Sequence, residues 1–193
     1  MKKTILFFFV LCCSFFLSKD CASQELEEIY KLANHYQSLN EQDQVKCLLF
    51  IFNRAYLLHQ EYQNKQITAV EFNLLKNLLF EIIEKIKLFK PREINGKYNQ
   101  LIAQENKQAI LIDLTKNLNH PIAISIENQF FKNADTASTM FKDFYLTQLW
   151  RNAILGAYAL DFGNQHQEIA DTVYQAMYRT HLLLTKHQPE FLQ

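Results

Sequence analysis

The side chains best suited to acid–base chemistry lie on one side of a predicted helix near the end of the chain. At about 100° per residue, one narrow sector of the segment 168–186 holds Asp171, Tyr174, Tyr178 and His181. Ten residues of helix would place Asp171 and His181 roughly 15 Å apart, too far for an acid–base pair. The spacing therefore favours a solvent-facing or half-buried amphipathic strip, with its tyrosine rings packed and their hydroxyls in water. A surface that faces a ligand or partner is the alternative.

A second polar group interrupts the longest predicted helix, 135–162. Its members are Gln148, Arg151 and Asn152, followed two turns later by Tyr158. An arginine on a largely buried helix must find an acid, a carbonyl group or an anionic ligand, or reach water. We expect Arg151 to pair with Asp143, Asp161 or an acid on another helix. A pocket in which Arg151 binds a carboxylate or phosphate is the alternative.

Motifs for metal, cofactor and nucleotide binding do not occur in the sequence. No glutamate is followed three residues later by a histidine, as di-iron helical bundles require. The sequence also lacks a His-Glu-x-x-His motif, a Cys-x-x-Cys-His motif, a glycine loop for phosphate and a Gly-x-Ser-x-Gly turn. We therefore predict no metal site, no cofactor and no catalytic residue.

Few residues in this chain break a helix. With 3 glycines and 3 prolines among 193 residues, the composition favours long helices. We expect an all-α protein, a compact antiparallel bundle of five to seven helices in one domain. The clearest expected helices span 24–39, 40–64, 68–90, 135–162 and 168–186.

Several positions are expected to begin or orient these helices. Asn40 or Asp43 can cap the second helix, and Thr68 has capping-box spacing to Glu71. Asp135 is expected to cap the longest helix, and Gly163 to follow its end. The expected inward stripe of the third helix is Val70, Leu74, Leu75, Leu78, Ile82, Ile86 and Phe89.

The segment between the third and the longest helix is ambiguous. Two helices are favoured there, 99–118 and a second that begins near Pro121. The short apolar runs at 109–114 and 122–126 also alternate like strands, so a small β-hairpin near 109–126 is the alternative.

The first 23 residues have the pattern of a signal peptide. Two lysines precede the apolar run 4–17, which is shorter than the roughly 20 residues of a membrane-spanning helix. Cleavage near Ser23 would leave a mature domain, 24–193, that is periplasmic or secreted and has no membrane span. Its single cysteine, Cys47, lies in an apolar run and is expected to be buried and unreactive.

Charge and the lack of motifs narrow the function of the expected domain. The formal net charge is +0 for the whole chain and −2 for 24–193, because the first 23 residues hold three lysines and one aspartate. Nucleic-acid binding needs a clustered basic surface, so we exclude it. We expect a non-enzymatic module that binds or assembles with another exported or envelope protein. The alternative is a carrier of a small apolar or anionic ligand between helices. In either case the predicted surface residues are Arg151, Gln148, Tyr158, Tyr174, Tyr178 and His181.

Overall fold

The computed structural model describes residues 19–87, 111–112, 114–163 and 166–192. Every regular element among them is helical. The long helices are α2 (Lys19–Asn34), α3 (Glu41–Gln63), α4 (Ala69–Ile86), α7 (Pro121–Asn133), α8 (Thr139–Gly163) and α9 (Gln167–Lys186). Short turns of helix are η1 (Tyr36–Ser38), η2 (Leu114–Leu118) and η3 (Glu190–Leu192). The predicted all-α bundle is confirmed.

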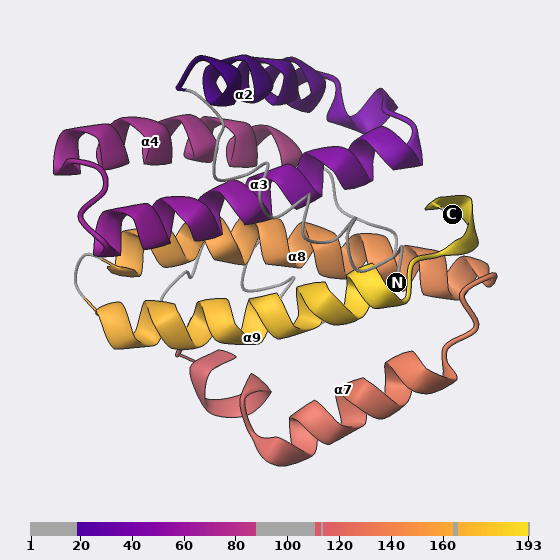
Figure 1. Cartoon of the computed structure of the whole chain (residues 1–193). Coiled ribbons are helices and arrows are strands. Elements are labelled where there is room, and N and C mark those ends of the chain that lie inside the picture. Colours follow the sequence, from indigo (N-terminus) through magenta and orange to yellow (C-terminus); the bar gives the residue numbers. More distant parts are fainter. Residues whose placement is uncertain (1–18, 88–110, 113, 164–165, 193) are drawn as a thin grey trace, which may run out of the picture.

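Helix α8 occupies the centre of the bundle. Figure 1 shows α3 on one side of it and α9 on the other, with α4 and α2 beyond α3 and α7 beyond α9. The pairs α3–α4 and α8–α9, each joined by a short connection, are antiparallel (Figure 1). Helices α3 and α8 run in the same direction, and Glu41 and Lys142 form an ion pair near their starts. The central position of α8 agrees with its apolar residues on several faces.

Local sequence signals set the beginnings of α3 and α4 as predicted. The Asn40 side chain accepts a hydrogen bond from the amide of Asp43 at 2.9 Å, which caps α3. Thr68 and Glu71 form a complete capping box in front of α4, since each side chain accepts from the backbone amide of the other residue. Both caps satisfy amide groups that have no partner inside the helix.

The cap of α8 differs from the prediction. The Ser138 hydroxyl accepts from the amide of Phe141 at 3.1 Å, so Ser138 is the capping residue and the helix begins at Thr139. Asp135 instead accepts from the amide of Ala137 at 3.1 Å and makes a local turn. Both residue types form such local bonds, and the turn at Asp135 moves the helix start to the later one.

The second strand of the alternative β-hairpin, 122–126, is not a strand. Residues 122–126 belong to α7, which begins at Pro121 as the favoured prediction states. His120 caps this helix through its Nδ1 atom, which accepts from the amide of Ile122 at 3.3 Å. Of the expected helix 99–118, the part 99–110 lies outside the described residues, and 111–112 are helical.

The expected orientation of α4 was partly wrong. Val70 and Leu74, expected to face inward, are 79% and 62% exposed. Phe72, Leu79 and Ile83 are buried. Helix α4 has apolar residues around most of its circumference, so periodicity alone does not determine which side faces the core.

The structure describes only the last few residues of the predicted signal peptide. Residues 1–18 lie outside the described part of the chain, and α2 begins at Lys19, so the predicted cleavage point near Ser23 falls within this helix. Among the described residues, no helix combines the length and apolarity needed to cross a membrane. Cys47 is buried, and burial raises the pKa of its thiol to about 12, which leaves it protonated and unreactive.

The turn after α3 contains a lysine in a conformation that favours glycine. Lys65 has φ 57°. Its amide donates to the Tyr62 carbonyl at 3.0 Å, and the Gln66 amide donates to the Glu61 carbonyl at 2.8 Å. These two bonds define a Schellman motif, whose left-handed position is usually glycine.

We expect Lys65→Gly to raise the free energy of unfolding by about 0.5–1 kcal/mol, because glycine has no Cβ to strain the left-handed backbone. Urea titration of both proteins measures this difference. Lys65→Ala is the control, since it removes the charge and keeps the Cβ, and it should bring no such gain. An equal gain from alanine would assign the effect to the charge.

Candidate functional site

Side chains of the polar strip predicted on the last helix contact side chains of α3. We call this line of contacts between α9 and α3 the seam. The Nε2 atom of His59 lies 2.7 Å from Oδ1 of Asp171. Further along, the Tyr178 ring stacks on Tyr56, with centroids 5.5 Å apart. These contacts bring together residues on helices that the sequence separates by more than one hundred positions.

Tyr174 is the centre of this seam and connects it to α8. Its ring is 1% exposed, and its hydroxyl donates to the carbonyl of Gly156 at 2.5 Å and lies 3.4 Å from the carbonyl of Ala55. A Cβ added to Gly156 would lie 3.1 Å from Phe52 and 3.8 Å from Tyr174. The missing side chain at Gly156 therefore makes room for a ring from α3 and a ring from α9 on the surface of α8.

Burial shifts the pKa of three groups in this seam, Tyr174, Tyr56 and His181. It raises the pKa of Tyr174 well above the usual range, so this phenol stays a hydrogen-bond donor. Burial also raises the pKa of Tyr56, to which the neighbouring Tyr178 adds. At His181, whose ring lies 5.0 Å from that of Phe52, burial lowers the pKa and favours the neutral imidazole.

Most rings of the seam are packed against one another, while the Asp171 side chain, which contacts His59, is 46% exposed. His59 is only 3% exposed, and its ring is packed against Tyr174 at 4.8 Å. His181 lies at the other end of the strip, beside Phe52. The expected solvent-facing or half-buried strip was wrong for Tyr174, which is buried and has its hydroxyl on backbone carbonyls and not in water.

The structure separates the predicted residues of α8 from the seam. Tyr158 is fully buried, with its ring 6.4 Å from that of Phe80 on α4. Gln148 and Arg151 are half-buried. Asp161, one of the acids expected near Arg151, forms an ion pair with Lys76 at 3.0 Å. Of the six predicted residues, only Tyr174, Tyr178 and His181 lie together along one seam.

A polar cluster that sequence reasoning missed attaches α7 to α9. We call it the Arg179 cluster; its members are Arg179, Thr180, Glu127, Asn119 and the carbonyl of Leu118. The guanidinium donates through Nε to Glu127 at 3.0 Å, through Nη1 to Asn119 at 3.2 Å, and through Nη2 to the Leu118 carbonyl at 2.7 Å. The second carboxylate oxygen of Glu127 accepts from the Thr180 hydroxyl at 2.6 Å. No motif in the sequence signals this convergence, which exists only because α7 folds back on α9.

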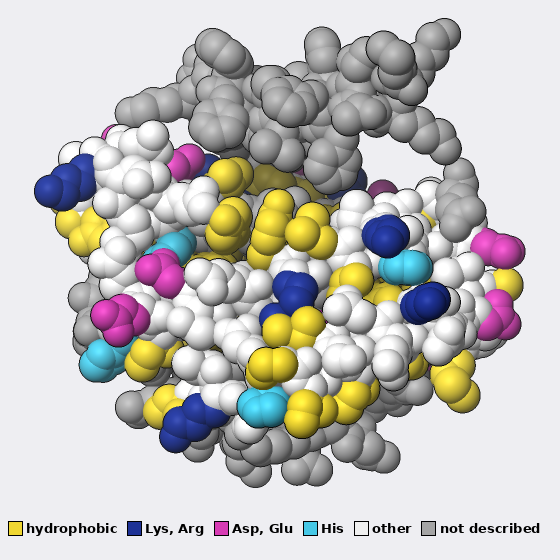
Figure 2. Space-filling view, turned by 60° about the horizontal axis from the view of Figure 1, so that its bottom comes forward, with side chains coloured by type: hydrophobic (Ala, Val, Ile, Leu, Met, Phe, Trp, Pro, Cys, Tyr) yellow, Lys and Arg dark blue, Asp and Glu magenta, His cyan; other side chains and the backbone are white. Residues whose placement is uncertain are grey.

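Helix α7 exposes an apolar stripe. Ile122, Ile126 and Phe130 are 64%, 62% and 45% exposed, at spacings i, i+4 and i+8 that put them on one side of the helix. Figure 2 brings forward the bottom of the view in Figure 1, where α7 lies, and shows hydrophobic side chains exposed on this face of the molecule. The spacing of the stripe is visible in the sequence. The exposure of the stripe is not, because an apolar stripe ordinarily predicts a face turned toward the core.

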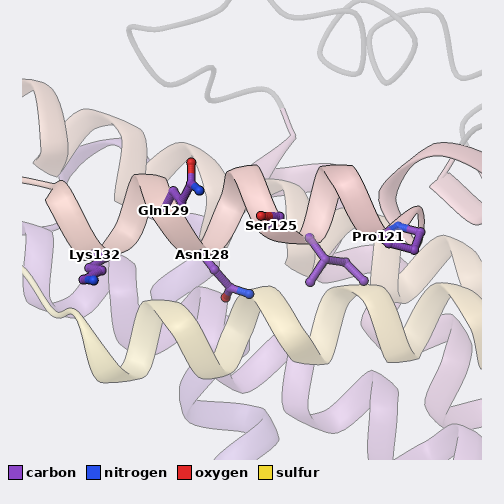
Figure 3. A pocket seen from close by; sticks show the side chains of 6 residues that line it. Pro121, Ser125, Asn128, Gln129 and Lys132 are labelled. Atoms are coloured by element: carbon purple, nitrogen blue, oxygen red, sulfur yellow. The ribbon is translucent and has the colours of Figure 1, made fainter.

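A shallow hollow of about 350 Å³ adjoins α7. It is lined by Pro121, Ile124, Ser125, Asn128, Gln129 and Lys132. Figure 3 shows the Asn128 side chain pointing toward α9 and Gln129 pointing away from it. None of the six predicted surface residues lines this hollow.

Neither a metal centre nor a relationship to another protein identifies the site. The described part of the chain holds no group of three or more metal-ligating side chains. No protein family matches the sequence, and neither a curated protein nor a solved structure matches the chain.

Proposed function

We propose that this chain is an exported helical protein that works by binding another exported or envelope protein through α7. Signal-peptide cleavage near Ser23 would release it into the periplasm or the medium. The observation that carries the proposal is the exposed stripe of Ile122, Ile126 and Phe130. The proposed role is non-enzymatic, because His59 and Tyr174, which lie in the strip with the best acid–base groups, are buried against each other.

The stripe has the form of a helix that inserts into a groove. Anchors at i, i+4 and i+8 are the pattern by which amphipathic helices dock on a partner. Exposed apolar residues in ones and twos, such as Val70 and Leu74 on α4, are common, whereas a run of three over two turns of one helix favours an interaction surface. Ser125 and Gln129 lie beside the stripe on the same helix and would supply a polar rim.

The carrier alternative has less support. Its expected site near Tyr158 and Tyr174 is occupied by side chains, since both rings are buried and Tyr174 bonds to backbone carbonyls. The hollow along α7 is open and adjoins neither residue. A carrier would also need an enclosed pocket with a few convergent polar groups.

The proposal is tested by photo-crosslinking in the natural host. A photoreactive amino acid at Ile122 should give an adduct with one specific exported protein, and Ile126→Asp should reduce that adduct about tenfold or more, as for a central interface residue. Leu74 on α4 provides the matched control, because it is 62% exposed, like Ile126. A photoreactive group at Leu74 should not capture that protein, and Leu74→Asp should leave the adduct at Ile122 intact. Equal adducts from both positions, or an adduct that Ile126→Asp leaves unchanged, would contradict binding through α7.

A further inference from the structure

The attachment of α7 to the rest of the bundle is light. Of its 13 residues only Phe131 is buried, whereas α9 buries seven side chains and α8 is buried along almost all of 149–160. Phe131 packs near the rings of Phe141, Phe144 and His187, at centroid distances of 6.4, 5.7 and 5.8 Å. The free energy needed for local opening is lowest where few apolar contacts must be lost.

Both ends of α7 have backbone suited to a hinge. His120, before the helix, has φ −68° and ψ 135°, and Ala134, after it, has φ −68° and ψ 134°. These extended residues separate α7 from η2 on one side and from the turn at Asp135 on the other. Hinges are commonly a few residues at the ends of elements that absorb changes in φ and ψ.

The Arg179 cluster spans the first of these hinges. Arg179 bonds to Leu118 and Asn119 before His120, and to Glu127 after it. The side chains of Arg179 and Glu127 are only 24% and 23% exposed, so their charge-assisted bonds are partly shielded from water. Breaking the bonds to Glu127 would free the helix, while Leu118 and Asn119 keep their contacts with α9.

We propose that α7 is a detachable helix that opens as a unit about His120 and Ala134 while α3, α8 and α9 stay folded, and that the Arg179 cluster holds it closed. Opening exposes Phe131 together with the aromatic side chains beneath it. This property belongs to the isolated chain and does not depend on the proposed partner.

Hydrogen exchange on the purified full-length protein, followed by mass spectrometry, tests the proposal without a partner. In the unmodified protein, amides of 122–133 should exchange at least tenfold faster than those of 149–160. Arg179→Ala should speed exchange in α7 a further 10- to 100-fold, the effect of losing charge-assisted bonds, and should change exchange in 149–160 less than threefold. If Arg179→Ala does not fold, Glu127→Gln provides the same test with a smaller expected factor.

Arg54→Ala is the matched control. Arg54 forms a similar pair with Glu61, at 3.2 Å and with side-chain exposures of 20% and 29%, but entirely within α3. It should leave exchange in α7 unchanged. Exchange in α7 as slow as in α8, or an equal acceleration of both helices by Arg179→Ala, would overturn the proposal.

Discussion

Replacing Tyr174 by alanine is expected to lower the free energy of unfolding by about 3–5 kcal/mol, the usual cost of deleting a buried aromatic side chain. The ring is 1% exposed and lies 4.8 Å from His59 and 5.7 Å from Tyr56. Alanine would leave a cavity where α3, α8 and α9 meet. It would also remove the hydroxyl that bonds to the Gly156 carbonyl.

Two further variants divide this loss into its parts. Tyr174→Phe keeps the ring and removes only the hydroxyl, so we expect a loss of about 1 kcal/mol. Tyr178→Ala is the control on the same helix; its side chain is 39% exposed, and its removal should cost less than about 2 kcal/mol. Equal losses from Tyr174→Ala and Tyr178→Ala would contradict the central role of Tyr174.

Urea titration monitored by tryptophan emission measures these changes. The chain has one tryptophan, Trp150, which is 2% exposed and donates from its indole nitrogen to the Ile86 carbonyl at 3.1 Å. Its emission therefore reports loss of the contact between α8 and α4. Unchanged slopes against urea concentration would show that a variant altered stability and not the extent of unfolding.

The second large effect is expected from Gly156→Leu, which should cost about 3 kcal/mol through overpacking. A Cβ at this position already lies 3.1 Å from the Phe52 ring, which is itself 1% exposed. The remaining atoms of leucine would have to displace Phe52 or separate α3 from α8. The same urea titration measures the loss.

Gly156→Ala and a double variant provide the controls. Alanine adds one methyl group and gains about 1 kcal/mol in helix propensity, so its net effect should lie within about 1 kcal/mol of zero. Phe52→Ala should offset part of the loss in Gly156→Leu, because it vacates the space that leucine needs. Strictly additive losses in the double variant would show that Phe52 is not the residue that excludes leucine.

Much of the fold follows from short-range signals in the sequence. Asn40 and the pair Thr68–Glu71 mark helix starts because a cap depends on residues within one turn. The prediction of Asp135 as the cap of α8 was wrong because Ser138 can accept an amide bond equally well, and the geometry of the intervening turn decides between the two. Val70 was misplaced because α4 is apolar on most sides.

The site was less predictable because its contacts are long-range. The strip on α9 was found from its periodicity, but His59, its partner across the seam, lies 112 residues before Asp171. The side chain of Arg179 meets its partners only after α7 folds back on α9. Periodicity places residues on one face of a helix, and only tertiary packing decides what that face meets.

The central place of α8 also determines when the bundle can assemble. During synthesis, α3 emerges long before α8, so its apolar side has no α8 to cover it while the intervening chain is made. The seam closes later still, since His59 must wait for Asp171 near the end of the chain. Contacts of such long sequence separation slow folding. The chain should therefore remain open to chaperones and proteases until α9 is complete.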